Sequence, residues 1–110
     1  MKIKNLTKKS IISENAFEAK NYENRLLGLI LYKKPIAMIF HTRFGLHTLF
    51  MKYPIDVIIL DKQKKVAKLK KKLVPNKFFV WKPVYPLVIE LPAGSITKSK
   101  TEIGDLLEFI

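Results

Sequence analysis

The sequence predicts a mostly β protein, a compact antiparallel β-sandwich or barrel with one N-terminal helix. Three observations predict this fold class. Short apolar runs of strand length recur from Ile36 onward. Turn residues separate these runs, and they do not alternate with long amphipathic helices. A chain of 110 residues has the size of one domain, so we expect residues 1–110 to form a single domain.

The strongest strand signal is the run Ile-Asp-Val-Ile-Ile-Leu, from Ile55 to Leu60. It is β-branched and apolar, and polar residues follow it. Both faces of such a strand are mostly apolar, which predicts a central strand covered on both sides. Alternation along the strand assigns the side chains to two faces, Ile55, Val57 and Ile59 on one and Asp56, Ile58 and Leu60 on the other.

Asp56 is the unusual residue of this strand. An unpaired buried carboxylate costs several kcal/mol, so Asp56 must accept hydrogen bonds if the strand is central. The expected donors are Lys52, His47, Arg25 or backbone amides. A structural role in holding the fold is the preferred interpretation, and an acid/base site around His47 and Asp56 is the alternative.

The remaining elements follow from local patterns. Asn15, with Glu18 three residues later, predicts a helix start, and apolar residues extend this helix from about Ala16 to Leu29. Gly104-Asp105 predicts a hairpin between the segments 101–103 and 106–109. Further strands are expected at Lys2–Leu6, Ile36–Phe40, His47–Met51, Lys65–Leu73 and Leu87–Leu91.

The charge, the cysteine content and the lack of long apolar stretches limit the classes of function that the protein can have. The formal net charge is +12, and nineteen of the 21 basic residues are lysine. An anionic partner such as nucleic acid would suit this charge, but genome composition or solubility alone can also produce it. The absence of cysteine excludes disulfides and thiolate metal sites. No apolar stretch is long enough to cross a bilayer and the first residues do not resemble a signal peptide, so we expect a cytoplasmic protein without membrane contact.

Two basic segments could meet a nucleic acid. Lys68, Lys70 and Lys72 alternate along an expected strand, opposite Ala67, Leu69 and Leu73, with a spacing of roughly 6.7 Å. Lysines on an edge strand also deter aggregation, and this second interpretation is preferred. The segment from Val74 to Pro86 mixes aromatics with lysines. Its rings could stack bases, line a small pocket or plug the core, and the core plug is preferred. The nucleic-acid candidates are Lys68, Lys70, Lys72, Lys77, Trp81 and Lys82.

No cofactor or metal is expected. His41 and His47 could face each other across two strands and, with Asp56, bind zinc or iron, but no compact ligand motif supports such a site. Nucleophile-elbow, phosphate-loop and dinucleotide motifs are absent from the sequence.

Several short motifs occur in a characteristic order. Arg25-Leu26-Leu27-Gly28-Leu29 precedes Met51-Lys52 and the segment Pro54-Ile55-Asp56-Val57; Glu90-Leu91-Pro92-Ala93-Gly94 and Ile103-Gly104-Asp105 close the chain. This pattern, from about residue 16 to residue 110, resembles the family called domain of unknown function 192. The chain departs from it at Ile30, where the family usually has Met, and at Phe50, where Trp is frequent.

The resemblance implies a small mostly β fold with one N-terminal helix and no established reaction. It marks Arg25, Met51, Asp56, Glu90, Gly94, Gly104 and Asp105 as members of a shared pattern. We expect a binding or accessory module more than an enzyme, with weak nucleic-acid binding and a small enzyme as alternatives. The residues of a candidate pocket are His47, Met51, Lys52, Asp56, Arg25, Glu90 and Asp105.

Overall fold

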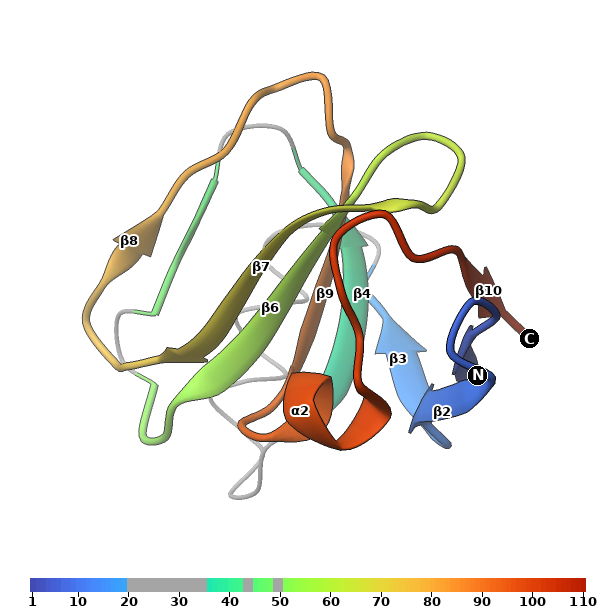
Figure 1. Cartoon of the computed structure of the whole chain (residues 1–110). Helices are drawn as coiled ribbons and strands as arrows, with labels where there is room; N and C mark the ends of the chain where they lie inside the picture. Colours follow the sequence, from blue (N-terminus) through green and yellow to red (C-terminus); the bar gives the residue numbers. More distant parts are fainter. Residues whose placement is uncertain (20–35, 43–44, 49–50) are drawn as a thin grey trace.

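The computed structural model describes residues 1–19, 36–42, 45–48 and 51–110, and strands dominate it (Figure 1). A five-stranded sheet has the order β3-β4-β9-β6-β7, a three-stranded sheet the order β10-β1-β2, and β5 pairs with β8. The elements are β1 (Ile3–Asn5), β2 (Ser10–Ser13), β3 (Ala16–Glu18), β4 (Ala37–His41), β5 (Leu46–His47), β6 (Ile55–Leu60), β7 (Val66–Leu73), β8 (Phe78–Phe79), β9 (Leu87–Pro92), α2 (Ser95–Ser99) and β10 (Leu107–Phe109).

The predicted fold class is confirmed, because the two larger sheets pack together in a compact sandwich. Strands β6 and β9 occupy the middle of the larger sheet, and every residue of β6 is buried. All neighbours in this sheet are antiparallel except β3 and β4, which run parallel. The predicted strand at Ile55–Leu60 is therefore confirmed, with both of its faces covered.

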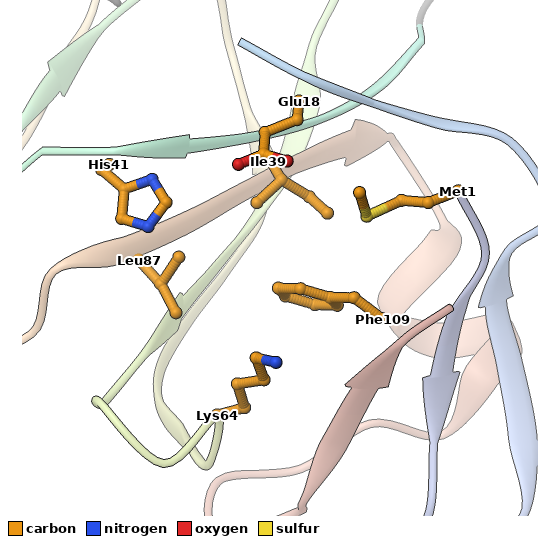
Figure 2. A pocket seen from close by; sticks show the side chains of 7 residues that line it. All are labelled: Met1, Glu18, Ile39, His41, Lys64, Leu87 and Phe109. Carbon is orange, nitrogen blue, oxygen red and sulfur yellow. The ribbon is translucent and has the colours of Figure 1, made fainter. Parts of the chain in front are cut away.

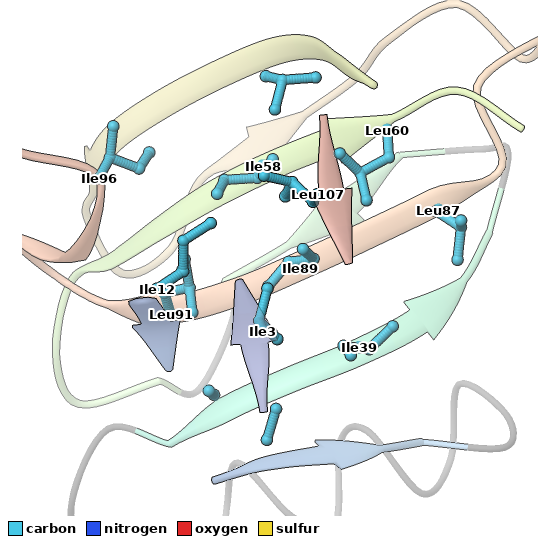
Figure 3. Close-up of a cluster of buried hydrophobic side chains, with 13 residues drawn as sticks. Ile3, Ile12, Ile39, Ile58, Leu60, Leu87, Ile89, Leu91, Ile96 and Leu107 are labelled. Atoms are coloured by element: carbon cyan, nitrogen blue, oxygen red, sulfur yellow. The ribbon is translucent and has the colours of Figure 1, made fainter. Parts of the chain in front are cut away.

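The first core lies between the two larger sheets (Figure 3). Ile3 and Leu107 of the smaller sheet pack with Ile58 and Ile89 of the larger one, and Ile96 of α2 closes the same layer. Ile58 and Leu60 belong to this core, as strand alternation predicted. Its buried members are Ile3, Ile12, Ala16, Ala37, Ile39, Ile58, Leu60, Val66, Leu87, Ile89, Leu91, Ile96 and Leu107.

The second core covers the opposite face of the five-stranded sheet. Ile55, Val57 and Ile59 of β6 face it, and Trp81 from the segment between β8 and β9 packs onto them. The buried members are Ala19, Met38, Phe40, Met51, Ile55, Val57, Ile59, Leu73, Trp81 and Val88. The aromatic segment thus plugs a core in part, which was the preferred interpretation.

Three expectations for the secondary structure need correction. Residues 16–18, where the helix was expected to begin, form strand β3, because they pair in parallel with β4; the rest of the expected helix, residues 20–29, lies outside the described residues. The expected C-terminal hairpin is wrong, because β10 pairs with β1. The sequence patterns also missed α2, whose five residues are too few to show a helical period.

A β-bulge changes the faces of β7. Val57 pairs with Lys70 and Ile55 pairs with Leu73, so the chain gains a residue opposite Asp56. Lys72 adopts a left-handed backbone with φ of 51° at this point. The expected assignment of Leu73 to the face opposite Lys70 is therefore wrong, and Leu73 is buried in the second core.

Candidate functional site

Asp56 is fully buried and binds three backbone amides. Its Oδ1 accepts a hydrogen bond from the amide of Lys72 at 3.0 Å. Its Oδ2 accepts from the amides of Gly94 at 3.1 Å and Ile96 at 2.9 Å. Gly94 can present its amide because its φ is 98°, in the left-handed region. The predicted amide donors are therefore present, and Asp56 joins β6 to the β7 bulge and to α2.

Glu90 is also fully buried, but it lies on the other side of the sheet from Asp56. Its register partners in β4 and β6 are Met38 and Val57, both members of the second core. Tyr53 packs against the same core. Burial of the Tyr53 phenol, together with the negative charge of Glu90, raises the pKa of Tyr53 above its usual value.

Asp105 belongs to a third place, a buried polar network beside β1. Its carboxylate accepts hydrogen bonds from Asn5 Nδ2, Lys8 Nζ and the amide of Glu102, each at 2.9 Å. Asn5 Nδ2 also donates to Thr101 Oγ1 at 3.1 Å. The network holds the segment before β10 against the loop after β1.

The candidate pocket residues are therefore distributed over separate places. Met51 is buried in the second core and Lys52 is exposed. Asp56, Glu90 and Asp105 occupy the three environments above. Arg25 and the side chain of His47 lie outside the described part of the chain. Within the described part of the chain, the carboxylates of Asp56, Glu90 and Asp105 therefore form no common site.

The histidines do not face each other across neighbouring strands. His41 ends β4 and pairs with Leu87, whereas His47 is in β5 and pairs with Phe78 of β8. Among the residues that the structure describes, no three His, Cys, Asp or Glu side chains form a group that could hold a metal ion.

A lysine-lined groove lies between β7 and β8. From Lys62 to Ile89 the chain carries nine lysines and no acidic residue. Three of these lysines, Lys70, Lys72 and Lys77, line one pocket of about 300 Å³. Its other lining residues are Leu73, Val74, Phe78 and Phe79. We call this pocket the β7–β8 groove.

The aromatic residues of the segment from Val74 to Pro86 have different environments. Phe78 is 73% exposed, whereas Trp81 is buried and donates from Nε1 to the carbonyl of Tyr85 at 2.9 Å. The structure thus places Trp81 in the second core and leaves Phe78 on the surface. Lys68 Nζ lies 4.9 Å from the centre of the Phe79 ring and donates to the carbonyl of Val80 at 3.1 Å, which fixes the loop over β7.

The sequence patterns missed Phe78 as the exposed ring. Its neighbour Phe79 packs against the second core, and alternation along β8 turns Phe78 the other way. If Phe79 is placed in the core, alternation along the strand predicts that Phe78 is exposed. Lys82 is exposed but does not line the groove.

The fold and these sites define a small β-sandwich with buried carboxylates and a basic groove. The chain matches the DUF192 family, described as Uncharacterized ACR, over residues 6–109, and it belongs to that family. A UPF0127 protein from Pyrococcus furiosus is 37% identical over 111 residues, which cover 96% of this chain and 95% of the relative. The resemblance predicted from the sequence motifs is thereby confirmed.

Two solved structures share the fold. A protein of unknown function from Novosphingobium aromaticivorans matches with a TM-score of 0.80 and 15% identity, covering 98% of this chain and 82% of the other. A protein from Sinorhizobium meliloti, described as a candidate transcription regulator, matches with a TM-score of 0.76 and 17% identity, covering 97% and 89%. In the described part of the present chain, no helix has the length and apolar character needed to cross a bilayer.

Proposed function

We propose that this protein is a binding module and that the β7–β8 groove binds single-stranded nucleic acid without sequence preference. One observation carries the proposal: Lys70, Lys72 and Lys77 line a single groove next to Phe78, which is 73% exposed. Lysines attract the phosphate chain, and an exposed ring offers a stacking surface to any base. The scarcity of arginine is consistent with binding that does not read base sequence.

Protection of a sheet edge is the competing explanation for these lysines. Strand β7 is an edge strand of the five-stranded sheet, so Lys70 and Lys72 also hinder the pairing of that edge with other chains. Edge protection does not account for Lys77, which comes from the loop after β7, or for an exposed phenylalanine beside the lysines. These two residues favour a ligand. The description of the S. meliloti protein as a candidate transcription regulator is compatible with nucleic-acid binding.

The test of the groove is a fluorescence anisotropy titration with a labelled single-stranded oligothymidine. Contacts with three or four phosphates should reduce affinity roughly 20–50-fold between 50 and 200 mM salt. The triple variant Lys70→Gln, Lys72→Gln, Lys77→Gln should bind at least about tenfold more weakly, with a salt slope lower by about 2.

The matched control changes the same number of charges away from the groove, at Lys9, Lys98 and Lys100, all exposed. This control should keep most of the affinity. Equal losses in both triple variants would assign the binding to net charge and reject the groove. Absence of binding by the unmodified protein at low salt would reject nucleic acid as the ligand.

A separate prediction concerns Phe78. Phe78→Ala should weaken binding by about 1–3 kcal/mol and leave the salt slope unchanged, because stacking involves no counterion release. The same titration measures both quantities. Ile103→Ala, a change at a 66% exposed residue outside the groove lining, should have no effect. A Phe78 variant with full affinity would show that the ring does not contact the bases.

A further inference from the structure

A second pocket, of about 300 Å³, opens at the border of the first core (Figure 2). It shares no lining residue with the β7–β8 groove. His41 and Leu87, which are register partners in β4 and β9, contribute one wall. Phe109 of β10 contributes the facing wall, so the pocket lies where the two larger sheets meet. We call it the border pocket.

The border pocket has an apolar interior. Ile39 and Leu87 form part of the first core and are 2% and 8% exposed, and Phe109 packs against that core. Met1, which is 45% exposed, adds a flexible apolar side chain. The apolar body of a small ligand would displace water from these surfaces, which favours binding.

Three polar groups surround this apolar interior: Glu18, Lys64 and His41. Figure 2 shows Glu18 and Lys64 on opposite sides of the pocket, with the apolar side chains between them. Lys64 Nζ lies 5.0 Å from the centre of the Phe109 ring, which holds the ammonium at the pocket wall. Among the described residues, neither Glu18 nor Lys64 has an ion-pair partner.

We infer that the border pocket binds a small zwitterion with an apolar body, of the class of short apolar peptides. Its ammonium group would meet Glu18, its carboxylate would meet Lys64, and its side chains would cover Ile39, Leu87 and Phe109. The two charges of a single amino acid are attached to the same carbon, whereas Glu18 and Lys64 face each other across the pocket; a dipeptide separates its charges by a peptide unit. The volume of about 300 Å³ lies at the small end of ligand pockets.

The test is a titration of the ¹⁵N-labelled protein with L-leucyl-L-leucine, followed by NMR. Saturable shifts are expected for the amides of Ile39, His41, Leu87 and Phe109. N-acetyl-leucyl-leucine loses the ammonium, and leucyl-leucinamide loses the carboxylate, so each should bind at least about fivefold more weakly than the free dipeptide. The absence of saturable shifts at these amides up to millimolar concentrations would overturn the inference.

Variants of Lys64 and Glu18 show which of these side chains binds the carboxylate of the dipeptide and which binds its ammonium group. Lys64→Met should bind the free dipeptide and its amide equally, and Glu18→Gln should no longer discriminate against the acetylated form. Lys62→Met changes an exposed lysine of the same turn and should keep both preferences. Discrimination that survives in both Lys64→Met and Glu18→Gln would overturn the assignment. The outcome is independent of nucleic-acid binding, because the two pockets share no lining residue.

Discussion

Asp56→Ala should lower the free energy of unfolding by about 3–5 kcal/mol. The substitution removes the acceptor of three backbone amides, those of Lys72, Gly94 and Ile96. The carboxylate is fully buried, so water cannot readily replace it at these amides. The left-handed backbone of Lys72, which costs about 1–2 kcal/mol, would also lose the hydrogen bond that it serves. Urea denaturation midpoints measure the effect.

Asp61 supplies the control for this prediction, because it directly follows β6 and accepts hydrogen bonds from two backbone amides, those of Gln63 at 2.8 Å and Lys65 at 3.0 Å. These hydrogen bonds are exposed, so Asp61→Ala should lose only about 0.5–1 kcal/mol. Asp56→Asn keeps the shape and one acceptor, and it should fall between the two. An unchanged midpoint in Asp56→Ala would show that the carboxylate does not stabilise the β7 bulge or α2.

Asp105→Ala should lower the free energy of unfolding by about 2–3 kcal/mol at pH 7. Asn5, which is 1% exposed, would lose one of its two acceptors inside the protein. The amide of Glu102 would lose its acceptor as well, whereas the ammonium of Lys8 would keep its ion pair with Glu102 at 3.0 Å. Chemical denaturation of the variant and the unmodified protein gives the difference.

The contribution of Asp105 should also depend on pH. Burial alone would raise the pKa of the carboxyl, but hydrogen bonds from Asn5, Lys8 and the amide of Glu102, with the charge of Lys8, outweigh burial and lower the pKa of Asp105. A folded-state pKa below the unfolded value of about 3.9 means that this stabilisation is complete above that pH. It is lost as the pH falls through the lower folded-state pKa.

The control for this pH dependence is Asp105→Asn, which cannot ionise. The stability difference between the unmodified protein and this variant should stay constant from pH 7 to about 5 and shrink below about 4. Subtracting the two curves removes the contributions of the other carboxylates. A difference that persists unchanged to about pH 2 would show that the charge of Asp105 does not stabilise the network.

Local patterns predicted the centre of the sheet well. The six residues from Ile55 to Leu60 form one buried strand, and alternation assigned both of its faces, because side chains on a regular strand must alternate. Alternation stopped predicting the faces of β7 at Lys72, because the extra residue of the bulge reverses the side-chain faces of the residues that follow it. Ala16 to Glu18 can adopt a helix or a strand, and only the distant pairing with β4 selects the strand.

The candidate sites were less predictable because they depend on contacts between distant segments. The sequence identified Asp56 as a buried acceptor, but its partners in α2 are about forty residues away. Lys70, Lys72 and Lys77 were expected to be basic surface, but only the fold of the loop brings Lys77 and Phe78 beside β7. The border pocket draws its lining from both ends of the described chain and from its middle, so no sequence window contains it.

The pairing of β1 with β10 has a consequence for the folding pathway. Ile3 lies opposite Phe109, so the pair joins residues separated by nearly the whole chain. Closing a loop of that length costs about 4 kcal/mol of chain entropy before any contact compensates it. The three-stranded sheet should therefore dock late, after the hairpin of β6 and β7 has formed locally. Until it docks, the apolar face that carries Ile58 and Ile89 is open to other unfinished chains, and nascent molecules are most prone to aggregation during that interval.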